Sequence, residues 1–319
     1  MGNSSGSRVI AITGAAGYIG SRLLDHILEK QEVLKVIAID NKPIIGIHPK
    51  LISAQIDINA SLDSLFLDNQ VDTVIHLAFV IQQLRDRSAS IKANIEGTYN
   101  LLSAVEKTRV KKLIYLSSST VYGALPDNLD FLTENDTPRP SREFHYAWDK
   151  RKAEIALEKS QGLSNGIEIS ILRSSIVMGP NAQNSITDSL SNPFLIGIRG
   201  SNPQLQFTHE SDLVEIIWQF IAESHTGIYN IAGPGSISWS EVAKRSGTKM
   251  IWLSPRIAYG ILTILWKLRV QNKANSSGLD YIRWPWLVST KKIEDQLKYR
   301  FMYTSADAFD AYVLGRGLH

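Results

Sequence analysis

The stretch ITGAAGYIGSRLLDHIL, residues 12–28, decides the fold of this chain. Its three glycines, Gly14, Gly17 and Gly20, lie three residues apart and follow an apolar run at 9–12. Apolar residues then recur at helical spacing, at positions 23, 24, 27 and 28. The pattern predicts a strand, a turn with almost no side chains, and an amphipathic helix.

Such a turn suits a dinucleotide. The missing side chains at Gly14 and Gly17 let backbone N–H groups approach a pyrophosphate, and the helix N-terminus attracts its negative charge. Gly20 allows the helix to pack closely on the strand. The spacing is T-G-x-x-G-x-x-G rather than G-x-G-x-x-G, and a plain tight turn is the alternative.

Strands and helices alternate along the first 180 residues. The predicted strands are 8–12, 33–40, 51–57, 72–78, 111–119 and 167–173. The predicted helices are about 18–30, 60–67, 88–107 and 144–159, and the third carries one apolar stripe through Ile91, Ile95, Tyr99, Leu102 and Val105. This alternation predicts an α/β fold, a doubly wound parallel Rossmann sheet with helices on both faces.

The pattern changes after Gly179-Pro180, where Asn, Ser, Gly and Pro become frequent, before a helix at 209–224 and a strand at 227–233. We therefore predict two parts. Residues 1–180, with a return segment 205–233, form the dinucleotide-binding domain, and residues 234–319, with 181–204, form a smaller C-terminal substrate-binding lobe. The tryptophans of this lobe suit an apolar pocket or an ordinary core equally: Trp252, Trp266, Trp284 and Trp286.

Composition narrows the class of protein. The 319 residues are 44% hydrophobic, enough for a large core, and the net charge of +3 shows no long basic block that would indicate nucleic acid. The chain has no cysteine, which excludes disulfides and thiolate ligands, and no metal site is predicted. The first ten residues lack the apolar core of a signal peptide, so we expect a cytoplasmic protein.

One segment near the end, residues 250–268, is strongly apolar but contains Pro255, Arg256 and Lys267. It is too short and too interrupted to span a bilayer. We expect an amphipathic helix packed on the core, with attachment to a membrane surface as the alternative.

Two aspartates close predicted strands. Asp40, followed by Asn41, can accept both ribose hydroxyls of adenosine and would repel a 2′-phosphate, which predicts NAD rather than NADP. A turn-capping aspartate is the alternative. Asp57 could bind the adenine amine or cap the helix expected near Ala60.

Tyr146 and Lys150 lie four residues apart in HYAWDKRKAE and so share one face of a helix. A tyrosine and a lysine at this spacing occur often by chance, so the pair by itself does not indicate a catalytic site. The neighbouring segments of the sequence make a site more plausible. The serines of LIYLSSSTVYG (113–123) end a predicted parallel strand, where open α/β sheets bind ligands, and Asn94 lies in a mostly apolar helix.

Together these segments resemble the extended short-chain dehydrogenase/reductases of the NAD-dependent epimerase/dehydratase type. The resemblance covers most of the chain and is carried by TGAAGYIG (13–20), IDN (39–41), HLA (76–78), NIEGTYNLL (94–102), SSSTVYG (117–123), YAWDK (146–150), LRSSIVMGP (172–180) and HESDLVEII (209–217). It implies NAD as the cofactor and a homodimer in which the helices near 88–107 and 144–160 pair across a two-fold axis.

The resemblance also implies roles for single residues. Tyr146 and Lys150 match the catalytic tyrosine and lysine, Ser118 the catalytic serine, and Asn94 an asparagine that would anchor a water, unless it is a satisfied polar residue in a kinked helix. Besides Tyr146 and Lys150, the expected cofactor contacts are Gly14, Gly17, Tyr18, Ile19, Asp40, Asn41, Asp57, Ile58, Leu77 and Ala78.

The chemistry is consistent with these roles. Hydride transfer from an alcohol requires removal of the hydroxyl proton, and a free tyrosine, with a pKa of about 10, is a poor base at neutral pH. The ammonium of Lys150 and the positive nicotinamide should favour the phenolate of Tyr146 and lower its pKa. Lys150 would also hold the nicotinamide ribose, and Ser118 would position the substrate oxygen.

Three departures from the family pattern bear on the substrate. Ser119 and Thr120 replace the Asp-Glu pair of the dehydratases, so dehydration is not expected. Ile176 replaces an asparagine that binds nucleotide sugars, and Leu205 and Gln206 stand where an arginine would bind the diphosphate. The pattern therefore favours a less charged, apolar alcohol or ketone. His209 is expected to be structural.

From the sequence we predict an NAD-dependent oxidoreductase that acts on a small-molecule secondary alcohol or ketone through Ser118, Tyr146 and Lys150. The first alternative is a sugar or nucleotide-sugar epimerase with the same site. The second is a non-catalytic NAD(H)-sensing protein. We expect neither nucleic acid as a partner nor a membrane span.

Overall fold

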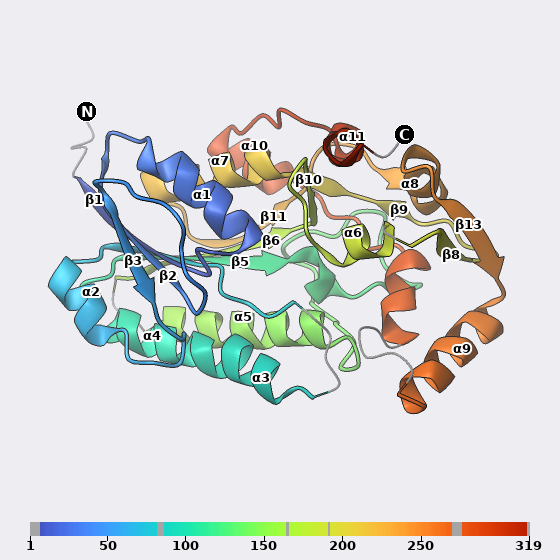
Figure 1. The fold of residues 1–319 in the computed structure, drawn as a ribbon, viewed down its shortest axis with the longest axis horizontal. Helices are drawn as coiled ribbons and strands as arrows, with labels where there is room; N and C mark the ends of the chain where they lie inside the picture. The colour runs from blue at the N-terminus through green and yellow to red at the C-terminus, as the bar shows by residue number, and fades with distance from the viewer. Residues whose placement is uncertain (1–6, 82–85, 164–165, 191, 270–275, 318–319) are drawn as a thin grey trace.

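The computed structural model describes residues 7–81, 86–163, 166–190, 192–269 and 276–317 (Figure 1). A sheet of seven parallel strands lies at its centre, in the order β11-β6-β5-β4-β1-β2-β3. The strands are β1 (Arg8–Thr13), β2 (Val33–Asp40), β3 (Leu51–Gln55), β4 (Thr73–His76), β5 (Lys112–Ser118), β6 (Glu168–Ser174) and β11 (Gly227–Ile231). The predicted doubly wound Rossmann sheet is confirmed.

Helices cover both faces of this sheet (Figure 1). Because successive strand residues point to opposite faces, Ile10 and Ile12 of β1 lie in one core, and Val9 and Ala11 lie in the other. The first core is closed by α1 (Tyr18–Leu28), α7 (Glu210–Ala222) and α10 (Lys291–Leu297). The second is closed by α2 (Asp63–Asn69), α4 (Gly97–Lys107) and α5 (His145–Leu163).

The strand order reverses at β1, which pairs with β2 on one side and β4 on the other. In open α/β sheets, ligands bind outside the carboxyl ends of the strands at such a point of reversal. The glycine turn that follows β1 and the residues Leu77 and Ala78 that follow β4 both lie at this point.

Smaller elements extend the molecule beyond one end of the large sheet (Figure 1). Two-stranded sheets pair β7 (Ile176–Met178) with β10 (Phe207–His209), β8 (Phe194–Ile198) with β13 (Lys249–Leu253), and β9 (Gln204–Leu205) with β12 (Ile237–Ser238). The accompanying helices are α6 (Ser185–Leu190), α8 (Trp239–Arg245), α9 (Pro255–Lys267), α11 (Ser305–Arg316) and the 3-10 helix η3 (Ser276–Ile282). A third core includes Phe207, Trp239 and Phe309.

The proposed division of the chain stays a prediction, with one difference. The helix α10 falls in the predicted lobe 234–319, yet its Ile293 and Leu297 pack in the core of the large sheet. Parts of both predicted units, residues 1–6, 82–85, 164–165, 191, 270–275 and 318–319, lie outside the described residues.

The helix expected over 88–107 is divided. It consists of α3 (Ser88–Ile91), a π-helical turn η1 (Lys92–Glu96) and α4. A π turn inserts an extra residue and shifts the helical period, so the expected apolar stripe does not continue. Tyr99, a member of that stripe, is 55% exposed, whereas Asn94 in the π turn is buried.

The apolar segment 250–268 is also divided. Lys249–Leu253 forms the strand β13, and the helix α9 starts at Pro255 after its N-cap Ser254. The expectation that its apolar face packs on the core is wrong for much of α9, because Ala258 is buried but Ile257, Ile261 and Ile264 are exposed. No helix among the described residues is both long enough and apolar enough to cross a membrane.

Candidate active site

The glycine turn closes tightly on the chain that follows β4. Gly14 has a φ of 75°, in the left-handed region. A Cβ on Gly14 would lie 2.6 Å from the backbone nitrogen of Ala78, and a Cβ on Gly20 would lie 2.1 Å from the carbonyl oxygen of Gly14. Side chains at these two positions would therefore push the turn away from β4 and from α1, and the close packing expected of Gly20 is confirmed.

The N-terminus of α1 is open to an anion. Gly17 is its N-cap and provides no side-chain cap, and the first turn contains no acidic residue. Backbone N–H groups at such a helix start have no acceptor within the helix, so they suit a pyrophosphate. Ile19 belongs to this turn. Tyr18 does too, but its hydroxyl donates to Glu210 at the start of α7, so we expect Tyr18 to reach the cofactor through its backbone.

Asp40 lies at the end of β2, beside the glycine turn. Its carboxylate accepts from the backbone nitrogen of Ala16 at 3.0 Å and from that of Lys42 at 2.9 Å. Asp40 therefore does cap the turn. Because each carboxylate oxygen can accept more than one hydrogen bond, Asp40 can still accept hydrogen bonds from ribose hydroxyls. The neighbouring Asn41 is exposed. A 2′-phosphate placed here would meet the negative charge of Asp40.

Asp40 should make the protein bind NADH at least about tenfold more tightly than NADPH, because charge repulsion opposes the 2′-phosphate. Fluorescence titration of both cofactors measures this ratio. Replacing Asp40 with asparagine keeps the shape of the side chain and removes its charge, so it should lower the ratio of NADH affinity to NADPH affinity. The control Asp57→Asn should leave this ratio unchanged. Equal or tighter binding of NADPH by the parent protein would contradict the assignment.

Asp57 does not cap the next helix. Its carboxylate accepts from the backbone and side-chain nitrogens of Asn59 at 2.8 and 2.9 Å, and these bonds hold the pKa of Asp57 below its usual value. The helix α2 starts only at Asp63. Ile58 packs against α4, where a Cβ on Gly97 would lie 2.5 Å from its side chain. The capping alternative is thus wrong, and the adenine contact of Asp57 stays a prediction.

Ser118 and Tyr146 meet where β5 ends and α5 begins. The hydroxyl of Ser118 hydrogen-bonds that of Tyr146 and also accepts from Oγ1 of Thr120 at 3.0 Å. The preceding serine is turned away, since Ser117 donates to Glu154 at 2.6 Å. This geometry supports the choice of Ser118 from the run of three serines.

Lys150 lies one turn along the same helix and is buried. Its Nζ donates to the carbonyl of Leu116 at 2.6 Å and lies 3.7 Å from the centre of the Phe79 ring. Burial lowers the pKa of Lys150 to about 7, although the negative charge of Glu154 opposes the shift. An amine with this pKa exchanges a proton readily at neutral pH.

The pKa of Tyr146 differs from the sequence-based expectation. Burial raises it above the ordinary value, and the hydrogen bond from Ser118 only partly opposes this rise. The Nζ of Lys150 is engaged by the Leu116 carbonyl and the Phe79 ring. The protein groups alone therefore favour the protonated tyrosine.

Asn94 has a clear structural role. Its Oδ1 accepts from the backbone nitrogen of Val80 at 2.7 Å, and its Nδ2 donates to the carbonyl of the same residue at 3.1 Å. The side chain thus fastens the segment after β4 to the π turn of η1. This is the satisfied polar residue that the sequence left as an alternative, and the anchoring of a water stays a prediction.

Sequence reasoning missed two residues at this site. The ring of Phe79 lies 5.7 Å from that of Tyr146, edge to face, and also covers Lys150. Glu154 forms a buried, two-bond ion pair with Arg173, at 3.0 and 2.9 Å. Glu154 could have been found from the sequence, because it follows Lys150 by four residues and so lies on the same face of α5. For Phe79 the signal was its place directly after HLA.

Other candidates have structural surroundings. His209 caps α7 by accepting from the backbone nitrogen of Ser211 at 3.2 Å, and it stacks on Tyr303, so its expected structural role is confirmed. Trp286 lies in the third core, whereas Trp252 is exposed on β13. The tryptophans of the lobe thus do not share one environment.

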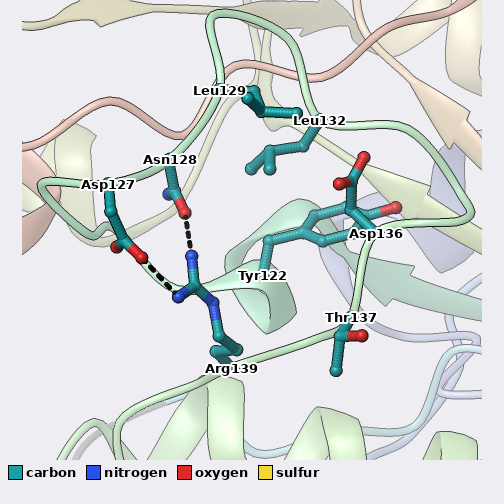
Figure 2. A pocket seen from close by; sticks show the side chains of 8 residues that line it. All are labelled: Tyr122, Asp127, Asn128, Leu129, Leu132, Asp136, Thr137 and Arg139. Carbon is teal, nitrogen blue, oxygen red and sulfur yellow. Dashed lines mark hydrogen bonds and ion pairs between the residues drawn. The ribbon is translucent and has the colours of Figure 1, made fainter.

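A cavity of about 280 Å³ lies under the loop that follows the V-Y-G motif (Figure 2). Its lining shares no residue with the catalytic or cofactor positions. Arg139 at this cavity is paired with Asp127 at 2.8 Å and with Asn128 at 3.0 Å, as Figure 2 shows. Because its cation is already held by protein groups, we do not assign this cavity to a diphosphate.

Known proteins share this fold over almost the whole chain. The UDP-glucose 4-epimerase of Thermotoga maritima, solved with UDP-glucose, has a TM-score of 0.76 at 18% identity and covers 97% of this chain and 98% of its own. The UDP-glucuronic acid 4-epimerase of Bacillus cereus, solved with NAD, has a TM-score of 0.72 at 22% identity, covering 96% and 98%. These likenesses show the fold, and the glycine turn is of the kind that binds dinucleotides in this fold.

Sequence comparison gives the family. The model of the NAD-dependent epimerase/dehydratase family matches residues 10–232, so the chain belongs to this family and is an NAD-dependent enzyme. An uncharacterised protein of Mycobacterium tuberculosis is 26% identical, over 98% of this chain and 85% of its own. The UDP-glucuronic acid decarboxylase 6 of Arabidopsis thaliana is 29% identical, over 74% of this chain and 72% of its own.

Proposed function

We propose that this protein is an oxidoreductase that transfers a hydride between NAD and a secondary alcohol or ketone, with Ser118, Tyr146 and Lys150 as its catalytic residues. We propose further that its substrate carries no nucleotide diphosphate. The observation that carries this second part is the environment of Gln206.

Gln206 is not free to bind a diphosphate. Its Nε2 donates to the carbonyl of Val288 at 3.1 Å and its Oε1 accepts from the nitrogen of the same residue at 2.8 Å. The preceding Leu205 is buried in the third core, and Ile176 packs against that core. The positions at which a nucleotide-sugar enzyme would need a cation and an amide are therefore apolar or already engaged.

The catalytic residues suit proton transfer at a carbinol oxygen. When bound, NAD supplies the acceptor for the hydride. In alcohol oxidation the substrate hydroxyl gives its proton to the oxygen of Tyr146, while Ser118 hydrogen-bonds and orients the same substrate oxygen. In ketone reduction the proton moves back from Tyr146 to the carbonyl oxygen. The raised pKa of Tyr146 favours the protonated form, which is the form required for reduction.

Net turnover of the cofactor tests this proposal. The protein is incubated with NADH and a panel of ketones, and with NAD and the matching alcohols, while NADH is followed by absorbance. A substrate that changes NADH in bulk supports the oxidoreductase. Conversion of a sugar without net change of NADH would establish the epimerase instead, and cofactor binding without any conversion across the panel would favour the NAD(H)-sensing alternative.

The epimerase alternative keeps support from the comparisons, because relatives and solved structures of this fold are named as enzymes of UDP-sugars. The surroundings of Ile176, Leu205 and Gln206 predict weak binding of such compounds. Each missing charged hydrogen bond costs roughly 1.5–3 kcal/mol, so two missing bonds weaken binding by about two to four powers of ten. UDP-glucose, UDP-galactose and dTDP-glucose should bind in the millimolar range or not at all.

Calorimetry on the NAD-loaded protein measures this binding. Other cations could replace the missing arginine, and Arg199, Arg256 and Arg283 lie in the C-terminal part of the chain. Micromolar binding of any of the three nucleotide sugars would favour the epimerase over the oxidoreductase. Substitution of each of these arginines would then show which one binds the diphosphate.

We also propose a homodimer that forms through α4 and α5, which lie side by side on one face of the sheet (Figure 1). Tyr99 of α4 and Ile155 of α5 are exposed at 55% and 36%, which leaves apolar surface for a partner helix pair. Light scattering should give twice the chain mass of 35.5 kDa. A monomer mass at micromolar concentration would contradict the dimer. The absence of cysteine agrees with the cytoplasm as its location.

A further inference from the structure

The outer face of α9 is an apolar stripe that nothing in the described structure covers. The apolar residues of the stripe follow one another at intervals of four, three and four residues, so they lie on one side of the helix. The last of them is the C-cap residue of α9. Their exposed fractions are 53%, 45%, 56% and 68% for Ile257, Ile261, Ile264 and Leu268. We refer to these four residues as the α9 stripe.

The inner face of α9 is held to the protein. Ala258, with Tyr259 and Leu262, packs in a small core with Ile198 and Leu279. The stripe is thus the outer side of a helix that is anchored by its other side. In Figure 1, α9 lies at the edge of the molecule, far from the seven-stranded sheet.

The charged residues of the chain segment that carries the stripe all have one sign. Residues 242–279 contain seven lysines and arginines and no aspartate or glutamate, although the whole chain has 31 acidic residues. Arg256, Lys267 and Arg269 are exposed on α9 or directly after it. Within the described part of the chain, none of these three forms an ion pair.

We propose that the α9 stripe is a docking surface for a membrane with anionic lipid headgroups. A helix with apolar side chains on one face and cations beside them lies in the plane of the interface, with the apolar face in the acyl boundary. The long side chains of Arg256, Lys267 and Arg269 can reach anionic headgroups, which attract each cation near the surface.

A second copy of the chain fits this surface less well. A two-fold contact brings the same patch of both copies together, so cations of one copy would face cations of the other. No acidic residue of the segment 242–279 is available to balance them. Such juxtaposition of like charges opposes self-association through the stripe.

The docking surface is connected to the active site. The hydroxyl of Tyr259 on α9 donates to Asp280 of η3 at 2.5 Å. In the same 3-10 helix, Tyr281 donates to the carbonyl of Thr120 at 2.8 Å, and Thr120 contacts Ser118. Membrane docking would hold this side of the site near lipid, where an apolar alcohol or ketone dissolves. The docking itself does not depend on the proposed function.

Vesicle co-sedimentation of the full-length protein tests the proposal. The protein should bind vesicles of equal parts phosphatidylcholine and phosphatidylglycerol, and should bind pure phosphatidylcholine at least about tenfold more weakly. Raising the salt to about 0.5 M NaCl should weaken binding to the anionic vesicles, because it screens the cations. Equal binding to both vesicle types, or no binding to either, would overturn the proposal.

Two variants locate the contact. The double variant Ile261→Asp/Ile264→Asp should lower vesicle partitioning by about tenfold or more, because it places charges in the stripe. The control is Leu129→Asp/Leu314→Asp, which changes two leucines that are 62% and 64% exposed elsewhere and adds the same charge. It should bind as the parent does.

NADH titration shows that each variant is folded. If the stripe variant binds vesicles as strongly as the control, the docking surface lies elsewhere and the proposal is wrong. If instead the stripe variant halves the mass measured by light scattering, the stripe is an interface between copies, and lipid docking is overturned.

Discussion

Replacing Tyr146 with phenylalanine should lower turnover by at least about a thousandfold and leave NADH binding nearly unchanged. The ring of Tyr146 is partly buried and contacts the rings of Phe79 and Phe144, at 5.7 and 6.3 Å between ring centres, and phenylalanine keeps these contacts. Only the hydroxyl is lost, and with it the group that exchanges a proton with the substrate oxygen. Ser118 loses one hydrogen-bond partner but keeps Thr120.

Steady-state rates with the substrate identified in the cofactor assay measure the first effect, and fluorescence titration measures the second. Tyr99→Phe serves as the matched control, because Tyr99 is exposed on α4, outside the proposed catalytic residues; since Tyr99 lies on the proposed dimer surface, light scattering checks that this variant keeps the mass of the parent. If the Tyr146 variant retains a tenth of the parent rate, Tyr146 does not transfer the proton. If it fails to bind NADH as well, the loss of activity reports on folding and not on chemistry.

Replacing Glu154 with glutamine should lower the free energy of unfolding by about 3–5 kcal/mol. Glu154 is fully buried and accepts from Arg173, Ser117 and Arg151. Burial by itself would lower the pKa of Arg173, but Glu154 raises it above its ordinary value, so the guanidinium remains charged. With glutamine in place, a buried positive charge is left without its counter-ion.

Urea unfolding followed by circular dichroism measures this loss. Glu158→Gln is the control, because Glu158 pairs with Arg151 near the surface, and exposed pairs contribute about 0.2–1 kcal/mol. The double variant Glu154→Gln/Arg173→Met should be less destabilised than Glu154→Gln alone, since it removes both charges. A loss for Glu154→Gln as small as that of the control would mean that Arg173 finds other partners.

The sequence alone determined the class of fold and the identity of the cofactor. Period-two and period-3.6 patterns are local, so the strands from β1 to β6 and the helices α1, α5 and α7 could be predicted within a few residues. The need for glycine at position 14 could be predicted too, because a turn of this kind requires it, and the structure shows the left-handed φ of 75°. The family resemblance and the family model agree on NAD.

Tertiary structure decided what depends on contacts between distant segments. Burial raises the pKa of Tyr146 and lowers that of Lys150, whereas from the sequence we expected Lys150 and a bound nicotinamide to lower the pKa of the tyrosine. The amide of Asn94 is engaged by Val80, across a π turn that the apolar spacing did not reveal. The exposed face of α9 also came from the structure, because an amphipathic pattern shows that a helix has an apolar side but not whether the protein covers it.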